Sequence, residues 1–335
     1  MRSGRRMPAR VYVCLALCGA LSMSGAVTGV APGSGADALV QQERYAMGTM
    51  FRVVVRSNGL AGEARRAVTA ALDEVTRLDR LLSHYDERSD LSRLTRDGVG
   101  RFVDVHADLY EVVTLALDVS RLSAGRFDIT VGPLVRLWQT ARDESRRPTD
   151  AELERAAACV GYEKINNEAP IRLKLQSGCM ALDLGAIGKG YAVDRALDVL
   201  RAHGIVHAVV NGGGSTIKAM GTAPGHEGWP VRTVTSTAPD ASVLLRDTAV
   251  STSQAHAEIV EPGRRAPIRQ APSVTVVATS AALADALSTA LLLSTIDEGR
   301  AMLRDLEDVS VTWTSAEGDV TMTSAHGRGD LGGTR

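Results

Sequence analysis

Residues 181–221 constrain this chain more than any other segment, because two glycine-rich stretches flank a single helix there. An apolar strand leads into Asp183–Gly190 (DLGAIGKG), the following helix ends at Gly204, and a second strand runs into Asn211–Ser215 (NGGGS). Glycine at this density is useful where a ligand or another backbone must approach the chain closely. The pattern predicts a site for a large phosphorylated ligand beside the helix.

Neither glycine-rich stretch matches a known catalytic or nucleotide motif in full. Gly185 lies too close to Gly188 for a P-loop, and Gly190 stands where Ser or Thr should bind magnesium. Residues 215–218 spell SxxK, but the SDN and KTG segments of serine acyl enzymes are absent from the sequence. Lys189 nevertheless lies where its amine can reach a phosphate.

The N-terminus has the three parts of a secretory signal peptide. Arginines at positions 2, 5, 6 and 10 precede an uncharged run to about Val30, and small residues continue to Ala36. We therefore expect residues 1–36 to be an export leader. Two alternatives stay open: an anchor helix, which the glycines and serines of the run weaken, and lipidation at Cys18, although Leu17 occupies a small-residue position.

The net charge and the cysteine content bear on whether the chain binds nucleic acid, forms a disulfide or holds zinc. The 335-residue chain has a formal net charge of -1, which gives no reason to expect nucleic-acid binding. Cys159 and Cys179 are the two cysteines outside the leader. They can pair in an oxidising compartment or be two buried thiols, and sequence spacing does not choose between these readings. The cysteine and histidine spacings are not those of a zinc site.

Hydrophobic periodicity predicts a single mixed α/β domain over residues 43–325, followed by a disordered tail at 326–335. The expected helices span 60–85, 109–122, 150–160 and 281–293, and a further helix follows the turn at 183–190 and ends at Gly204. The expected strands span 43–55, 171–175, 180–182, 208–210, 230–234, 243–251 and 273–278, with a hairpin over 309–314 and 319–323.

A carboxylate and a hydroxyl share one face of the helix expected at 281–293. Asp285 and Thr289 are four residues apart, which places both side chains on the same side of the helix. A carboxylate is costly to bury in so apolar a helix unless it is paired or holds a cation. Two hard oxygen ligands suit Mg²⁺, whereas the alternative is an exposed Asp285 that interacts with the helix dipole.

Five motifs, in this order, resemble the ApbE family of FAD:protein FMN transferases. They are Met47–Phe51 (MGTMF), Ser83–Tyr85 (SHY), Gly125–Val135 (GRFDITVGPLV), the two glycine-rich stretches, and Asp285–Thr289 (DALST). The resemblance covers about residues 45–323 and implies a single α/β domain built around a T-fold-like core.

The resemblance also implies a reaction and a location. FAD would be cleaved at its pyrophosphate with Mg²⁺ as cofactor, AMP would leave, and FMN would be joined by a phosphoester to a threonine or serine of an exported flavoprotein. The acceptor would be a redox-complex subunit or similar protein. The enzyme would act in the periplasm or on the outer face of the cytoplasmic membrane, either free or held there by its leader or a lipid.

Site residues follow from the resemblance by position. The implied FAD contacts are Met47, Tyr85, Arg126, Phe127, Asp128, Asp183, Lys189 and Ile259. The backbone carbonyl of Ala186 would hold Mg²⁺ with Asp285 and Thr289, assisted by Ser288. The metal and Lys189 would neutralise charge that builds up during phosphoryl transfer.

Residues 251–265 depart from the family pattern. Glu258 takes the position of the family's histidine, and Glu261 takes that of its aspartate. We expect Glu258 to activate the acceptor hydroxyl as a base, with His256 as the alternative and Lys189 as the third catalytic residue. If neither base acts, the chain would bind FAD or hydrolyse it to AMP and FMN without transfer.

Overall fold

The computed structural model describes residues 38–232, 243–255, 259–269, 273–315 and 320–324. The expected leader at 1–36 and the expected disordered tail at 326–335 lie outside these ranges. Within them, none of the helices combines the length and the apolar composition needed to cross a membrane.

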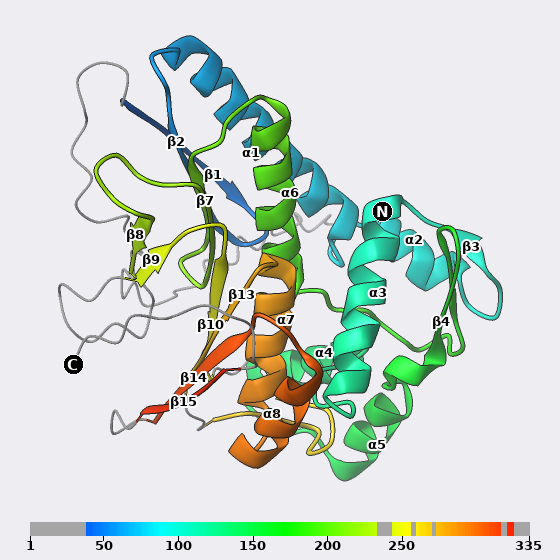
Figure 1. The fold of residues 1–335 in the computed structure, drawn as a ribbon. Coiled ribbons are helices and arrows are strands. Elements are labelled where there is room, and N and C mark those ends of the chain that lie inside the picture. Colours follow the sequence, from blue (N-terminus) through cyan, green and yellow to red (C-terminus); the bar gives the residue numbers. More distant parts are fainter. Residues whose placement is uncertain (1–37, 233–242, 256–258, 270–272, 316–319, 325–335) are drawn as a thin grey trace, which may run out of the picture.

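An eight-stranded antiparallel sheet forms the centre of the molecule (Figure 1). Its order is β1-β2-β6-β7-β10-β13-β14-β15, so the two strands from the first half of the chain form one edge, where β2 pairs with β6 from the second half. The strands are β1 Leu39–Ala46, β2 Thr49–Arg56, β6 Ala208–Gly212, β7 Thr216–Met220, β10 Ala249–Ser253, β13 Ser273–Ala278, β14 Ser310–Thr314 and β15 Val320–Ser324. This mixed architecture confirms the predicted fold class.

Turns divide two segments that were each expected to form one strand. The strand predicted over 43–55 is a hairpin, because Met47 and Gly48 both adopt positive φ angles, of 49° and 75°. Positive φ at both central residues of a two-residue turn matches the twist of the strands that it joins. The strand predicted over 243–251 is β9 (Val243–Leu245) followed by β10. The strand predicted over 180–182 is reduced to a single bridge at Ala181.

Three helices cover one face of the sheet: α1 (Ala61–Leu82), α6 (Gly188–Ala202) and α7 (Ala281–Leu292) (Figure 1). Apolar residues of α1 recur at helical spacing and are buried, as predicted for an amphipathic helix. In α7 every residue except Leu283 is buried, because this helix packs against α3, α6, β10 and β13. The candidate metal ligands therefore lie at the centre of the molecule.

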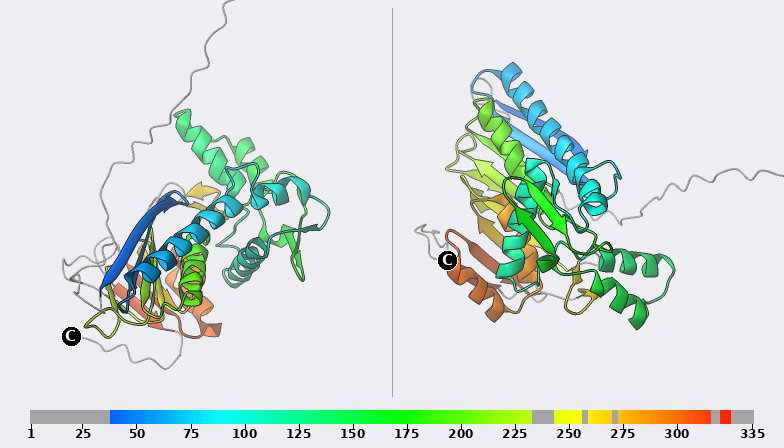
Figure 2. Two further views of the ribbon diagram at one scale, coloured as in Figure 1. Left: turned by 90° about the horizontal axis from the view of Figure 1, so that it is seen from above. Right: turned by 90° about the vertical axis from the view of Figure 1, so that its right-hand side faces the viewer.

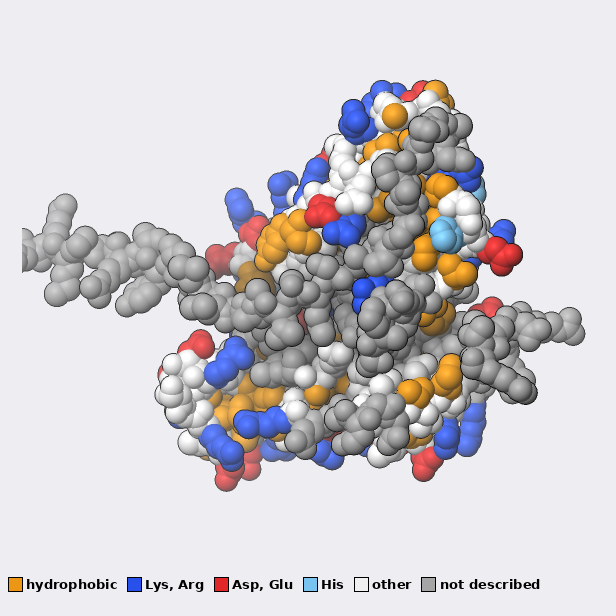
Figure 3. Space-filling model, turned by 90° about the vertical axis from the view of Figure 1, so that its left-hand side faces the viewer, with side chains coloured by type: hydrophobic (Ala, Val, Ile, Leu, Met, Phe, Trp, Pro, Cys, Tyr) orange, Lys and Arg blue, Asp and Glu red, His pale blue; other side chains and the backbone are white. Residues whose placement is uncertain are grey.

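The opposite face of the sheet has its own smaller core. The short pair β8 (Trp229–Val231) and β9 folds over it, and the fully buried Trp229 packs with Val54 and Val250 from the main sheet. On the side shown in Figure 3, hydrophobic side chains form several separate groups among charged ones.

Most of the remaining elements extend from one end of the helical layer, and α4 and α5 project furthest (Figure 2), whereas α8 packs against α7 and β14. The helices are α2 Asp90–Asp97, α3 Ala107–Leu122, α4 Gly132–Asp143, α5 Asp150–Ala158 and α8 Ile296–Met302, with 3-10 turns at Tyr162–Lys164 and Leu303–Asp305. The strands are β3 Val103–Asp104, β4 Ile165–Glu168, β5 Arg172–Leu175, β11 Val260–Glu261 and β12 Ala266–Pro267. A disulfide joins Cys159, at the end of α5, to Cys179, and this decides between the two readings left open by the sequence.

Candidate functional site

Asp285 is the centre of the candidate site. Its residue is 4 % exposed, and its carboxylate accepts hydrogen bonds from three elements. The Gly190 amide donates to Oδ2 at 3.0 Å, and the hydroxyls of Thr216 and Ser251 lie 3.1 and 3.3 Å from Oδ1. The Lys189 ammonium lies 3.9 Å from Oδ2. This burial excludes the alternative of an exposed, dipole-stabilising aspartate.

Three hydroxyls lie together one turn further along α7, two of them on the helix and one on the neighbouring strand β10. Ser288 and Thr289 are both buried, and the Ser253 hydroxyl from β10 lies 2.7 Å from Ser288 Oγ and 3.2 Å from Thr289 Oγ1. Ser288 also donates to the backbone carbonyl of Asp285 at 2.9 Å. The α7–β10 contact is thus lined by oxygen atoms.

The turn from Asp183 to Lys189 forms the facing wall. The Asp183 carboxylate accepts the Gly185 amide at 2.8 Å, and the Lys189 ammonium donates to the Gly185 carbonyl at 2.8 Å. These bonds close the turn on itself, with Ala186 half-buried inside it. The sequence assigned Lys189, Ala186 and Asp285 to one site. In the structure the first two belong to this turn, and Asp285 lies beside it.

The segment after α3 lies next to this turn, because the Asp183 amide donates to the Ile129 carbonyl at 2.7 Å. Phe127 is 2 % exposed and packs in the main core, so a flavin contact at this residue would have to involve its backbone. The Asp128 carboxylate accepts the Thr130 amide and hydroxyl and the Tyr162 amide, at 2.6–2.9 Å. Burial raises the pKa of Asp128 even though these hydrogen bonds favour the anion.

Arg126 connects this segment to the region that departs from the family pattern. Its guanidinium lies 2.9 Å from the buried carboxylate of Glu261 and 2.5 Å from that of Glu298 on α8. Arg264 lies 3.1 Å from the second oxygen of Glu261. The Thr295 backbone amide and then Arg126 lower the pKa of Glu298 to about 2. Ile259, two residues before Glu261, is partly buried against the core.

Two implied flavin contacts lie at the ends of other elements. Met47 occupies the β1–β2 turn and packs partly against the core. Tyr85 follows α1, is 79 % exposed, and its ring centroid lies 3.9 Å from that of His84. The proposed bases Glu258 and His256 lie outside the described residues, so their roles stay predictions.

The second glycine-rich stretch serves packing. Gly213 has φ of +71°, and a Cβ there would meet the Thr49 hydroxyl at 2.4 Å, so this glycine permits close contact with the β1–β2 turn. The Asn211 side chain accepts the Gly214 amide at 2.7 Å, which stabilises the turn. Lys218 pairs with Asp194 at 2.6 Å, an arrangement that gives no support to an SxxK site.

The donor set around Asp285 fits Mg²⁺. A carboxylate offers about four lone-pair directions, of which the Gly190 amide and the two hydroxyls use up to three. Oδ2 accepts the Gly190 amide and lies 3.9 Å from the Lys189 ammonium, which is beyond hydrogen-bond distance. Mg²⁺ commonly takes one or two carboxylates and completes its shell with water and substrate phosphates. Among the described residues, clusters of three His, Cys, Asp or Glu suited to a metal are absent.

Sequence reasoning missed several polar residues of this site. Thr216, Ser251, Ser253 and Asp194 come from β7, β10 and α6. The alternation of Ser251 and Ser253 along one strand was an available signal, because residues two apart share a face of a sheet. The helix that faces them could not be identified without the strand order.

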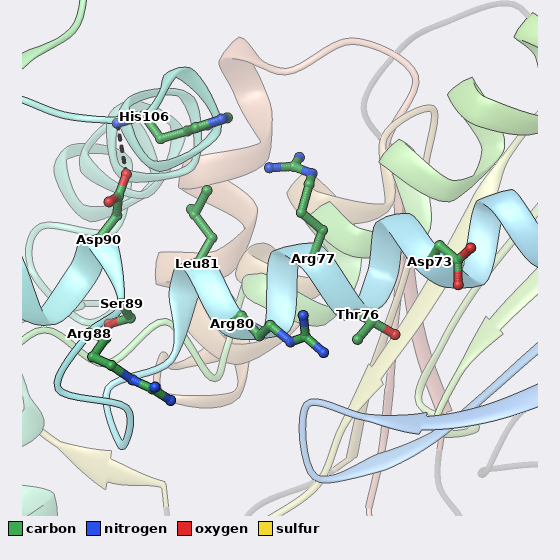
Figure 4. A pocket seen from close by; sticks show the side chains of 9 residues that line it. All are labelled: Asp73, Thr76, Arg77, Arg80, Leu81, Arg88, Ser89, Asp90 and His106. Carbon is green, nitrogen blue, oxygen red and sulfur yellow. Dashed lines mark hydrogen bonds between the residues drawn. The ribbon is translucent and has the colours of Figure 1, made fainter.

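A separate groove of about 620 Å³ lies over α1 and the starts of α2 and α3 (Figure 4). Arg80 and Arg88 extend to the same side of α1, and the His106 amide donates to Asp90 at 3.2 Å. Acidic residues, including Asp73, line the groove with the arginines, so its charge is mixed. None of the predicted site residues lines it.

Together, the fold and the site define a mixed α/β protein with a buried carboxylate and a lysine placed for a phosphorylated ligand. The chain belongs to the ApbE family, whose profile matches residues 47–313. A protein of Klebsiella pneumoniae named FAD:protein FMN transferase is 30 % identical over 314 residues, which cover 87 % of this chain and 89 % of that protein. A Treponema pallidum protein of the same name is 28 % identical, with coverage of 89 % and 88 %.

Solved structures agree with this membership. The apo flavinyl transferase ApbE of Pseudomonas stutzeri is 25 % identical and superimposes with a TM-score of 0.75, covering 86 % of this chain and 96 % of that chain. The ApbE protein of Thermotoga maritima is 28 % identical, with a TM-score of 0.73 and coverage of 84 % and 96 %. The similarity therefore extends over nearly the whole domain.

Proposed function

We propose that this protein is an Mg²⁺-dependent FAD:protein FMN transferase. The observation that carries the proposal is the meeting of Lys189 and Asp285 at 3.9 Å, in a chain whose relatives share that name. A lysine and a cation site at one turn supply the positive charge that pyrophosphate cleavage requires.

The reaction has a simple atom balance. The hydroxyl oxygen of an acceptor threonine or serine bonds to the phosphorus on the FMN side of the FAD pyrophosphate. The bond from that phosphorus to the bridging oxygen breaks, and AMP leaves with that oxygen. The hydroxyl proton passes to a base or to solvent. Bound Mg²⁺ would lower the charge on the pyrophosphate oxygens.

The chain's own groups bind and orient the substrate. Lys189 donates to the Gly185 carbonyl and is 26 % exposed at its side chain, so it can turn toward a phosphate oxygen. The N-terminus of α6, at Gly188, adds the amides and the dipole that favour an anion. Asp285 and Thr289, with the Ala186 carbonyl, would hold the metal opposite this helix start.

Binding or hydrolysis of FAD without transfer is the alternative that the altered 251–265 segment suggested. The family relatives carry the transferase name, and they favour transfer over that alternative.

Incubation of the protein with FAD, Mg²⁺ and a flavoprotein acceptor domain tests the proposal. We expect a covalently bound fluorescent flavin on the acceptor and an equal amount of AMP, both lost with EDTA. The variant Asp285→Ala should give neither product, whereas Asp198→Asn, on the exposed side of α6, should behave as wild type. AMP without labelled acceptor identifies the hydrolase, and the absence of both products from the wild type rejects the proposal.

We further propose that the protein is exported and acts on an exported acceptor. The leader pattern at residues 1–36 supports this, and so does the disulfide between Cys159 and Cys179, since such bonds persist in oxidising compartments. Cell fractionation combined with thiol alkylation is the test, and mass spectrometry of the N-terminus would distinguish a cleaved, lipidated or retained leader. A cytoplasmic protein with two free thiols would contradict this proposal.

A further inference from the structure

Helices α6 and α7 approach each other too closely for a side chain at Gly190. A Cβ there would lie 2.2 Å from the Ala281 carbonyl oxygen. The Gly190 amide reaches Asp285 at this same contact. The glycine-rich turn and the α7 ligands are thus joined at one point, with no side chain between the helices.

Asp194 makes a second contact between these helices, one turn further along α6. Its carboxylate accepts the Ala281 and Ala282 amides at 3.0 and 2.9 Å, and the Ser280 hydroxyl at 2.9 Å. The first amides of a helix have no partner within it. Here Asp194 satisfies two of them from another helix, while the Ser280 hydroxyl accepts a third, from Leu283, at 3.2 Å.

Strand β7 supports both aspartates. The Lys218 ammonium lies 2.6 Å from Asp194, and the Thr216 hydroxyl lies 3.1 Å from Asp285. Because residues two apart in a strand share a face, one face of β7 contacts both carboxylates. Asp194 is 18 % exposed at its side chain, so it can accept these contacts with little competition from water.

We propose that Asp194 is a positioning residue for the metal site. It fixes the first turn of α7 against α6, and the helix then carries Asp285 about 6 Å and Thr289 about 12 Å along its axis, to face the turn that contains Ala186 and Lys189. Loss of the carboxylate would release the start of α7, so the two sets of metal ligands would no longer be held at a fixed separation. The inference rests on the proposed function, because it concerns the geometry of that same site.

The test compares Asp194→Ala and Asp194→Asn with Thr149→Ala. Thr149 caps the remote helix α5, so its loss removes a helix cap without touching the site. We expect Asp194→Ala to raise the Mg²⁺ concentration for half-maximal AMP release by about tenfold, as is typical when a supporting contact of a metal site is removed. The KM for FAD should change much less. Asn retains an acceptor oxygen, so it should restore part of the loss, and Thr149→Ala should leave the Mg²⁺ dependence unchanged.

Amide hydrogen exchange without Mg²⁺ gives a second readout that does not depend on activity. Asp194→Ala should speed exchange in peptides from both α7 and the start of α6, including Gly190. An unchanged Mg²⁺ midpoint, or faster exchange confined to Ala281 and Ala282, would show that Asp194 is only a helix cap. A wild-type protein with no Mg²⁺-dependent AMP release would instead reject the proposed function, while the exchange result would still decide whether Asp194 joins the two helices.

Discussion

Two buried carboxylates, Asp285 at the centre of the candidate site and Glu261 in the segment that departs from the family pattern, are held in place by different interactions. Asp285 is 4 % exposed and is surrounded mainly by neutral donors, the Gly190 amide and the hydroxyls of Thr216 and Ser251. Glu261 is also buried, but its partners are the guanidinium groups of Arg126 and Arg264. The first centre belongs to the interior of the fold, and the second joins a short loop to the rest of the molecule.

This difference indicates which of the two carboxylates has contacts that are sensitive to solvent and salt. Hydrogen bonds to a buried carboxylate from the backbone and from strand hydroxyls are little affected by salt. The Arg126 side chain is 34 % exposed and Arg264 is 80 % exposed, so water and ions screen their ion pairs. We therefore expect the Asp285 centre to be little affected by salt and the Arg126–Glu261 ion pair to be weakened by it.

Replacing Asp285 should have the largest effect. Asp285→Ala should reduce AMP release and acceptor labelling by about a thousandfold, because it removes the carboxylate that we propose as a ligand of Mg²⁺. The amide and hydroxyls left without a partner should also lower the free energy of unfolding by about 2–4 kcal/mol. Steady-state kinetics and urea unfolding measure both. Activity near wild type would show that the catalytic centre lies elsewhere.

The second prediction concerns the helix contact beside that centre. Gly190→Ala should destabilise the protein by about 3 kcal/mol, since the new methyl group would overlap the Ala281 carbonyl and push α7 away. Gly62→Ala in α1 is the matched control, because its nearest neighbour is the end of Arg66 at 3.9 Å. That control should be neutral or stabilising, by up to about 1 kcal/mol. Equal unfolding midpoints for the two variants would refute the close contact.

The third prediction tests the charged centre. Glu261→Gln keeps the size of the side chain but removes its charge, so it should cost about 1–2 kcal/mol of stability. It should lower acceptor labelling by about tenfold, since a shift of the 259–268 loop misplaces groups near the reaction. The wild-type activity should fall as sodium chloride rises, and the variant should be less sensitive. If the variant labels the acceptor at the wild-type rate and has the wild-type salt response, this ion pair does not contribute to catalysis.

The smallest effect concerns pH. The pKa of Glu298 is lowered to about 2 in the folded protein, from an ordinary value of about 4.3 when unfolded. Its charge therefore contributes stability that is fully present above about pH 5 and is lost as the pH falls toward 2. Glu298→Gln retains a capping-box side chain but no charge. The difference in melting temperature between wild type and variant should shrink over this range, and a constant difference would mean that the charge does not matter.

Local patterns predicted much of the fold. The apolar spacing of α1, the capping box at the start of α5 and the stop of α6 near Gly204 are properties of neighbouring residues, so their helices were located within a few residues. Turns with unusual backbone angles were harder to predict from the sequence. The positive φ of Met47 divides a segment that otherwise has the composition of one continuous strand. Helices α2, α4 and α8 were not predicted.

The features of the candidate site also fall into those that local sequence predicted and those that it did not. By itself, the sequence determined which residues of the glycine-rich turn and of α7 are candidates for the site, because short motifs contain them. Only the tertiary structure decided that Asp285 is buried, that Cys159 bonds to Cys179, that Arg126 pairs with Glu261, and that Asp194 caps another helix. The physical reason is that these partners are 20 to 135 residues apart. Their meeting depends on the strand order and helix packing of the whole chain, which no local pattern records.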